Sequence, residues 1–305
     1  MTDTKSTPRD VQEDEAGKVA DAAEAAEAAG GARSARPAGG PEAADLPGGR
    51  RFARRLSGAA RPLVSLALTV AVWSALTALE VFSPQVLPSP ARVWSSATAM
   101  AAEGTLFTDL YWSGRRALTG FLLGSVLAIA VGALTARSKI VNTMLEGTLQ
   151  AIRPIPAIAL VPLAILWFGI GEESKLFLVS LGVFFPVWIT AHTGIAATRR
   201  DYLQVAACLD ASRRQTLFEV VLPAALPMIV AGLRVGIATS FILIVAAEMT
   251  GATSGLGFRL DQARLFSQAD RLFVALVFLG LLGALADGVF HRLTAPFISW
   301  SRERG

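Results

Sequence analysis

The sequence predicts an all-α polytopic membrane protein, and three observations lead to this fold class. Of the 305 residues, 53% are hydrophobic and only 17% are charged, which is more apolar than an ordinary soluble domain. Apolar runs of about twenty residues, the length that crosses the hydrocarbon layer of a membrane, recur along the chain. Short arginine-bearing segments separate several of these runs, as expected for cytoplasmic loops.

Counting the apolar runs predicts six transmembrane helices, with both chain ends in the cytoplasm. The spans are expected near residues 63–82, 115–136, 141–169, 173–196, 225–249 and 271–292. The segments expected in the cytoplasm carry basic clusters at 50–61, 137–139, 199–214 and 292–304. Arginines such as Arg115 and Arg116 also occur in the expected outer segments, so the charge bias is moderate, but the two chain ends agree.

Composition divides the chain into three regions. Residues 1–49 consist mainly of Ala, Glu, Asp, Gly and Pro, which predicts a disordered cytoplasmic tail. Residues 50–86 join an arginine cluster to an apolar run that is longer than the core of a signal peptide, which predicts an N-terminal anchor helix. Residues 87–305 hold the other spans and form the predicted transmembrane domain. An amphipathic stretch at its start is expected to lie along the outer membrane surface.

Several functional classes are disfavoured. The pI is near 9.7, but the arginines flank apolar segments and form no basic stripe with interleaved aromatics, so no nucleic-acid partner is expected. Cys208 is the one cysteine, so we expect neither a disulfide within the chain nor a cysteine-based metal site. No HExxH motif and no convincing nucleophile–base set occurs. An intramembrane enzyme is therefore not expected.

The third expected span contains the proline-rich stretch RPIPAIALVP. Proline removes a backbone donor and bends or breaks a helix, and inside a membrane such a break survives only where protein or a water-filled cavity covers the freed carbonyls. Arg153, Pro154, Pro156 and Pro162 are therefore candidates for the lining of a transport pathway. The alternative is a kink that only fits the neighbouring helix.

Ionisable residues inside spans are energetically costly, which makes them functional candidates. Arg234, in the fifth span, could attract an anionic substrate or extend to the cytoplasmic face. Glu248, at the outer end of that span, could belong to an outer gate, seat a partner protein or lie at the interface. His192 is expected to pack between helices, and Asp287 and His291, one turn apart, are expected to pair.

The segment between the fourth and fifth spans predicts two short helices. Apolar residues recur with spacings of three, four and seven from Tyr202 to Leu209, which predicts the first helix. Ser212 followed by Gln215 has the form of a capping box, which would start a second helix. Asp210 stands between them. Two helices with an abrupt turn would project into the cytoplasm and could contact a soluble partner.

The same segment carries a family resemblance. The run from Gln204 to Pro223, continuing AALPMIVAGLRVGIA, resembles the cytoplasmic EAA loop of binding-protein-dependent ABC importer permeases. IRPIPAIALVPLAILWFGIGEESK at 152–175, IVAAEMTGATSGLGF at 244–258 and ARLFSQADRLFVALVFLGLLGALAD at 263–287 agree with this family. The similarity extends in order from about Leu87 to Arg292 and is strongest to the aliphatic sulfonate, taurine and nitrate branch.

The resemblance implies a multi-pass permease subunit of the bacterial cytoplasmic (inner) membrane. Its implied partners are a second permease copy, cytoplasmic ABC ATPase subunits, an extracytoplasmic substrate-binding protein and membrane lipid. ATP and Mg would bind to the ATPase, and the chain itself has no GxxxxGK[ST] sequence to hold a nucleotide. The residues implied to couple it to the ATPase are Gln204, Ala206, Asp210, Ser212, Arg213, Arg214, Leu222 and Pro223.

Two positions depart from the family motif. Gln204 replaces its glutamate and Asp210 replaces its glycine. Glutamine offers only neutral hydrogen bonds, so the docking contact is expected to be weaker or altered. The glycine implies a backbone with positive φ, and aspartate is among the residues that best tolerate that conformation. The turn is therefore expected to persist.

The resemblance also implies the substrate class. A small anion, an aliphatic sulfonate or taurine, is the first expectation, and nitrate, bicarbonate or a vitamin precursor are the alternatives. A secondary transporter driven by an ion gradient is a further alternative, but it would use carboxylates at the membrane centre, and most acidic residues here lie near span ends. Whether transport follows ATP or an ion gradient distinguishes the two.

Overall fold

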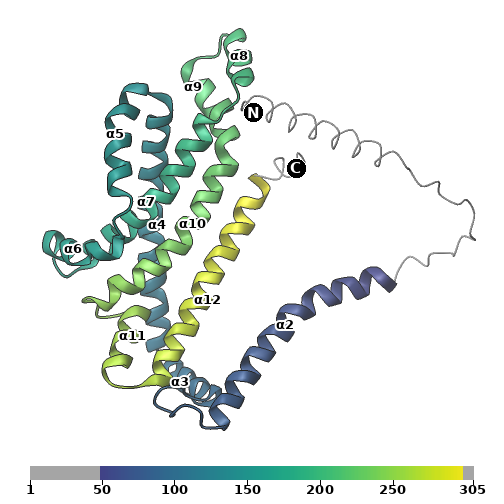
Figure 1. The fold of residues 1–305 in the computed structure, drawn as a ribbon, viewed down its shortest axis with the longest axis vertical. Helices are drawn as coiled ribbons and strands as arrows, with labels where there is room; N and C mark the ends of the chain where they lie inside the picture. Colours follow the sequence, from purple (N-terminus) through teal and green to yellow (C-terminus); the bar gives the residue numbers. More distant parts are fainter. Residues whose placement is uncertain (1–48, 298–305) are drawn as a thin grey trace, which may run out of the picture. The chain divides into compact units, whose positions relative to one another are not determined.

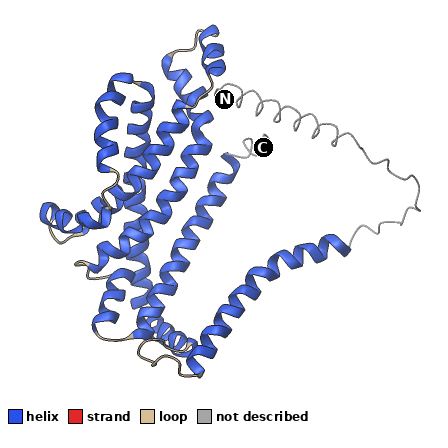
Figure 2. Cartoon of the chain, viewed as in Figure 1, coloured by secondary structure: helices blue, strands red, loops and turns tan. Residues whose placement is uncertain are grey.

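The computed structural model describes residues 49–297, and every regular element in that part of the chain is helical (Figures 1 and 2). The all-α prediction is confirmed. The predicted tail lies outside the described residues apart from Gly49. The chain divides after Pro62 into two units. Residues 49–62 form the start of helix α2 (Gly49–Ala78), and all other described elements belong to the unit from Leu63 onward.

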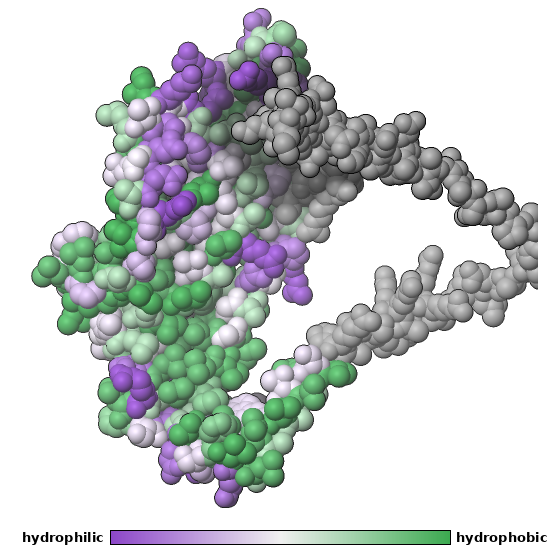
Figure 3. Space-filling model, in the orientation of Figure 1, coloured by the Kyte–Doolittle hydropathy of each residue, from purple (hydrophilic) through white to green (hydrophobic). Residues whose placement is uncertain are grey.

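Four helices among the described residues are long and apolar enough to cross a membrane. They are α4 (Thr105–Arg137), α7 (Glu172–Ala196), α10 (Leu222–Met249) and α12 (Ala269–Thr294). The predicted spans at 173–196, 225–249 and 271–292 correspond to the last three of these. In the space-filling view apolar residues cover most of the middle of the body, and hydrophilic residues gather near α8 (Arg200–Cys208) and α9 (Arg213–Gln215) (Figure 3).

The helix of the first predicted span, 63–82, ends earlier than expected. Helix α2 ends at Ala78, and its apolar described part, Val64–Ala78, falls below the length of a full span. Glu80 then adopts a positive φ of 52°, a conformation that cannot continue a helix. The described residues therefore support four spans, or five if a bent helix pair is counted, where the sequence predicted six.

The second predicted span begins earlier than residue 115. Helix α3 (Pro90–Ala102) is capped by Ser89, whose hydroxyl accepts a hydrogen bond from the Arg92 N–H. Gly104, with φ 74°, then turns the chain, and α4 starts at Thr105. The amphipathic stretch before the second span thus forms a separate short helix, α3, and the first residues of α4. Arg115 and Arg116, predicted at the start of the span, lie well inside α4.

The third predicted span, 141–169, is not one straight helix. Helix α5 (Lys139–Ile152) is followed by a 3₁₀ turn, η1 (Ala157–Leu160), and by α6 (Val161–Phe168). The two halves are bent by 86°, as in a broken span or a re-entrant loop. Pro154 and Pro156 lie at the break, where they cannot donate the backbone bonds of a continuous helix. The predicted break is confirmed.

Helices α4, α7 and α10 surround the main hydrophobic core, which includes Phe121, Val183 and Ile244. Small residues allow α4 and α7 to approach closely. A Cβ added at Gly124 would lie 2.4 Å from the backbone oxygen of Ser180, and the Ser180 hydroxyl donates a hydrogen bond of 3.1 Å to the Gly120 carbonyl. This contact fixes the spacing of the two helices.

Candidate functional site

The segment between α7 and α10 forms a helical elbow, defined as residues 200–221. It consists of α8 (Arg200–Cys208), a turn, α9 (Arg213–Gln215) and the π-helical η2 (Thr216–Val221). The first predicted short helix and the turn are confirmed. The second is not a separate helix, because it continues through η2 into α10. The Leu222 N–H bonds to the Leu217 carbonyl five residues back, and this wide turn accommodates Pro223 without a break.

The turn of the elbow has the backbone geometry that the sequence predicts. Asp210 has φ 51°, so the expected positive φ is confirmed. The Ala211 N–H donates to the Ala206 carbonyl at 3.0 Å and the Asp210 N–H to Ala207 at 3.1 Å. These are the two bonds of a Schellman motif, which ends α8 and reverses the chain.

The predicted capping box is also confirmed. The Gln215 N–H donates to the Ser212 hydroxyl at 3.3 Å, and the Ser212 N–H donates to the Gln215 side-chain oxygen at 2.9 Å. Both bonds satisfy donors that the first turn of a helix leaves unpaired. The direction of the chain after the turn is therefore set by side chains within the elbow itself.

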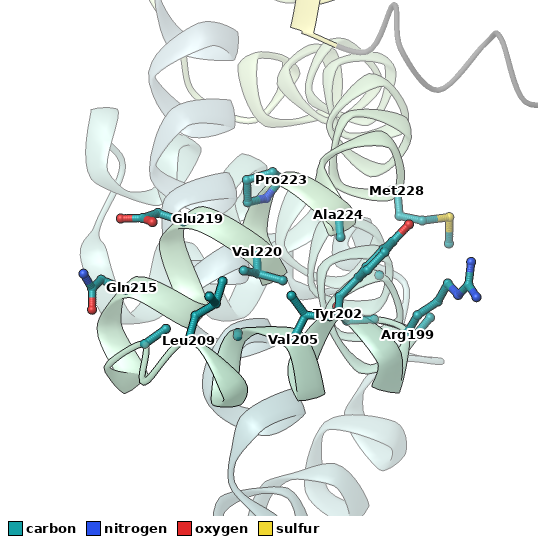
Figure 4. A pocket seen from close by; sticks show the side chains of 15 residues that line it. Arg199, Tyr202, Val205, Leu209, Gln215, Glu219, Val220, Pro223, Ala224 and Met228 are labelled. Atoms are coloured by element: carbon teal, nitrogen blue, oxygen red, sulfur yellow. The ribbon is translucent and has the colours of Figure 1, made fainter.

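An open pocket of about 860 Å³ lies between the two arms of the elbow. Val205 from α8, Leu209 just after that helix and Val220 from η2 point into it, with Pro223 at the start of α10 (Figure 4). Val205 and Leu209 are largely exposed, while charged and polar side chains, including Glu219, stand at the edge of the pocket. An exposed apolar hollow with a polar rim is typical of a protein-docking surface.

The implied coupling residues differ in exposure. Ala206, in α8, is buried, and Leu222 is half-buried. The others are exposed, namely Gln204, Asp210, Ser212, Arg213, Arg214 and Pro223. Ala206 and Pro223 line the pocket, and Gln204 does not. The elbow therefore presents the arginines and Asp210 on its outer side and apolar groups on its inner side.

A second site, which the sequence did not reveal as a unit, is a buried ionic cluster of Asp109, Ser113, Arg116, Glu172, Glu248 and Arg259. Arg116 in α4 bonds Glu172 with Nε and Nη2, both at 2.7 Å, and Glu248 with Nη1 at 2.8 Å. Its side chain is 4% exposed, that of Glu248 is 0% and that of Glu172 is 48%. Arg116 thus joins α4 to both α7 and α10.

Glu248 has enough partners to satisfy its burial. The Ser113 hydroxyl lies 2.7 and 2.9 Å from its two oxygens, and the Gly257 N–H donates to it at 2.9 Å. Gly255, with φ 120°, brings the backbone of the 251–258 loop over the carboxylate. Glu248 is therefore enclosed within this chain, and its role at an outer gate, a partner seat or the interface stays a prediction.

The remainder of the cluster fastens α4 to α11 (Leu256–Leu265). Asp109 accepts from the Arg259 Nε at 2.8 Å and from the Gly255 N–H at 2.9 Å. Arg116 and Asp109 were missed as site residues because they precede the apolar run of α4 in the sequence. Their acidic and basic partners lie more than fifty residues away along the chain, so no local pattern indicates the pairing.

Arg234 forms a different kind of pair. Its Nε and Nη2 bond the two carboxylate oxygens of Asp287 in α12, each at 2.8 Å. The expected pairing of Asp287 with His291 is replaced by this bidentate contact, which suits the planar guanidinium better. The Arg234 side chain remains 55% exposed and that of Asp287 38% exposed. The pair lies on the surface of this chain and within two spanning helices.

The other pathway candidates do not gather at one point. Arg153 and Pro156 line a pocket of about 450 Å³ with Thr239 of α10, and Pro154 is exposed at the break beside them. His192 lies within hydrogen-bonding distance, 2.9 Å, of the Thr135 hydroxyl, in agreement with its expected packing role. Within residues 49–297 no cluster of three or more His, Cys, Asp or Glu side chains has the arrangement of a metal site.

Known proteins share both the sequence and the fold. The family described as "Binding-protein-dependent transport system inner membrane component" matches residues 120–297. The putative aliphatic sulfonates transport permease protein SsuC of Bacillus subtilis is 35% identical over 83% of this chain and 90% of its own length. The taurine transport system permease protein TauC of Escherichia coli is 32% identical over 78% and 89%. The nitrate import permease protein NrtB of Synechocystis is 32% identical over 74% and 85%.

A solved structure shows the same fold. The inward-facing MetNI methionine ABC transporter aligns with a TM-score of 0.55 at 20% identity, over 65% of this chain and 98% of that chain. With the matched family and relatives of 32–35% identity, the assignment does not depend on one motif. The chain belongs to the binding-protein-dependent transport system inner membrane components, as an ABC importer permease of the aliphatic sulfonate, taurine and nitrate branch.

Proposed function

We propose that this chain is the permease subunit of an ATP-driven importer for a small anion, first of all an aliphatic sulfonate or taurine. It acts beside a second copy of itself, with α2 as the first of six spans and both termini in the cytoplasm. Cytoplasmic ATPase subunits bind ATP and Mg, and an extracytoplasmic protein delivers the substrate. The related permeases of sulfonates, taurine and nitrate support the choice of a small anion.

The observation that carries the proposal is the continuity of the elbow with a spanning helix. Residues Arg213–Met249 form one helical unit of 37 residues, about 55 Å long at 1.5 Å per residue. The apolar pocket between α8 and η2 offers a seat for an apolar side chain of the ATPase subunit. Movement of that subunit would then be transmitted along α10 to Arg234 and the buried ionic cluster.

The exposed charges of the elbow define the polar part of this contact. Arg213 and Arg214 would meet acidic groups of the ATPase, and Asp210 would meet a basic group. Gln204 is exposed outside the pocket and would contribute a neutral hydrogen bond. Docking therefore depends more on the apolar seat than on position 204.

The proposal is tested by co-purification. The tagged chain is produced with its ATPase and isolated in mild detergent. An Ala206→Glu variant, which places a charge at the buried position of α8 that lines the pocket, is isolated in the same way. Co-purifying proteins are identified by mass spectrometry. A P-loop ATPase is expected with the native chain and is expected to be lost from the variant.

The matched control is Thr98→Glu, which adds the same charge at an exposed position of α3. It is expected to retain the ATPase. Absence of any ATPase from the native chain in several detergents would contradict the proposal. Uptake that persists without ATP and stops when ion gradients are abolished would instead support a secondary transporter.

A further inference from the structure

The Arg234–Asp287 pair occupies an unusual position. Arg234 lies twelve residues after the start of α10, and Asp287 seven residues before the end of α12. Figure 1 shows these two helices side by side. The other ion pairs between spanning helices of the described chain, Arg116 with Glu172 and Glu248, place the arginine at 4% exposure. Arg234 is 55% exposed, so its pair is open on one side.

An open ion pair inside a membrane span requires water or protein beside it. Lipid tails offer no hydrogen bonds, and charged side chains in spans accordingly face the interior of a bundle or a water-filled cavity. The exposed positions of α10 around the pair, Ala231, Val235, Ala238 and Ile242, recur every three or four residues. They form one face of the helix, which carries a single charged group among small and apolar side chains.

Two pockets adjoin this face. One, of about 640 Å³, lies between α10 and α12 and is lined by Ala238, Gly280 and Asp287. The other, of about 450 Å³, is lined by Val235, Thr239 and Arg153. Arg234 precedes the lining residue Val235, and its partner Asp287 lines the first pocket. Both volumes fall in the range of small-molecule sites.

The geometry points to an anion-exchange site. We propose that the sulfonate group of the substrate binds the Arg234 guanidinium in competition with Asp287, while its short alkyl part lies against Ala238 and Ile242. This inference rests on the proposed function and adds the residue that contacts the substrate. Asp287 uses two of the five N–H donors of the guanidinium, which leaves three that Asp287 does not engage.

Competition by Asp287 gives the site the affinity that transport requires. An isolated arginine in a water-poor pathway would hold a sulfonate too tightly to release it, and a pathway works only if binding is weak enough for the ligand to leave. When the anion departs, the carboxylate again takes both donors and the pair returns to zero net charge. Asp287 is therefore a positioning and release residue, and Arg234 is the substrate contact.

A purely structural pair makes a different prediction. If the pair only fastened α10 to α12, loss of either partner would break the same two hydrogen bonds, and both variants would change substrate binding in the same direction. In an exchange site the two variants have opposite effects. Removing Arg234 removes the anion contact, whereas removing the Asp287 charge removes its competitor.

The test measures anion binding directly. The permease–ATPase complex is placed in lipid nanodiscs without nucleotide or binding protein, and radiolabelled taurine and ethanesulfonate are the probes. We expect Arg234→Gln to abolish binding and Arg234→Lys to weaken it about tenfold through loss of the planar fork. Asp287→Asn is expected to tighten binding about tenfold or more, because the competing charge-assisted bonds are lost, and to slow release.

Arg271→Gln is the matched control. Arg271 pairs with Glu103 at 4.0 Å, between the start of α12 and the end of α3, and its loss is expected to leave binding unchanged. Complex assembly is checked for every variant by size-exclusion chromatography, and Arg234→Lys tests the site if Arg234→Gln does not assemble.

Equal weakening by Arg234→Gln and Asp287→Asn, or no effect of either, would overturn the inference. ATP-driven uptake by the native complex with its binding protein is measured in parallel. If the native complex imports sulfonate normally but the Arg234 variants bind it as tightly as the native chain, the proposed function stands and only the exchange site is removed. Failure of the native complex both to import and to bind either sulfonate removes the two together.

Discussion

Arg116 forms one ion pair with a buried carboxylate and another with a half-exposed one, so the contributions of the two pairs to stability can be compared at a single side chain. It bonds the enclosed Glu248, whose side chain is 0% exposed, and the half-exposed Glu172, at 48%. Arg116→Met strands a buried carboxylate and is expected to lower the free energy of unfolding by about 3–5 kcal/mol. Glu172→Gln leaves Arg116 with Glu248 and the Ser254 carbonyl, and leaves the buried Lys175 ammonium with the Gly171 carbonyl. It is therefore expected to cost less than Arg116→Met, about 1–2 kcal/mol.

The assay is reversible unfolding of the purified chain in mixed micelles with increasing denaturing detergent, followed by tryptophan fluorescence. A double variant, Arg116→Met with Glu248→Gln, is expected to recover part of the loss, because no unpaired charge remains. Arg115→Met is the matched control. The exposed Arg115 has its guanidinium over the Trp112 ring, 5.0 Å from the ring centroid, and its loss is expected to cost less than about 1 kcal/mol. Equal losses for Arg116→Met and Arg115→Met would refute the reasoning.

Three further predictions concern backbone geometry. Gly124→Val places a side chain against the Ser180 backbone, and its Cβ alone would lie 2.4 Å from the Ser180 carbonyl oxygen. It is expected to destabilise the chain by about 3 kcal/mol or more, and an unchanged detergent midpoint would contradict this. Ser212→Ala removes the capping hydroxyl and is expected to cost about 1 kcal/mol of elbow stability, seen as faster amide hydrogen exchange in residues 213–216, and protection equal to the native chain would contradict it. Asp210→Gly relieves the positive φ of 51° and is expected to slow exchange around the turn, whereas Asp210→Val should accelerate it. Equal exchange in the two would contradict the assigned turn.

Features set by neighbouring residues were predictable from the sequence. The capping box of Ser212, the positive φ of Asp210 and the break near Pro154 all depend on chemistry within a few positions. The sequence also predicted the helices of the fourth, fifth and sixth apolar runs, because their hydropathy is high and their ends are polar. Each of these features is present in the structure.

Features set by distant residues were not predictable in the same way. Arg116 was predicted at the start of its span, yet it lies well inside α4. Its partners Glu172 and Glu248 are 56 and 132 positions away, so no local pattern indicates them. Asp287 has His291 one turn away on its own helix, but Arg234 of α10 supplies the better partner. The second elbow helix merges into α10 because a π-helical turn accommodates Pro223, and no sequence signal for such a turn was recognised.

The glycine contacts between α4 and α7 limit how this subunit can move. Gly124 of α4 leaves no room against Ser180 of α7, and Arg116 of α4 bonds Glu172 at the start of α7. Helices α4 and α7 are therefore expected to move as one block. The joint available for change is then the bend between α5 and α6. A subunit with few joints converts a push on its cytoplasmic side into a tilt of whole helices, and its core keeps the same neighbours throughout the cycle.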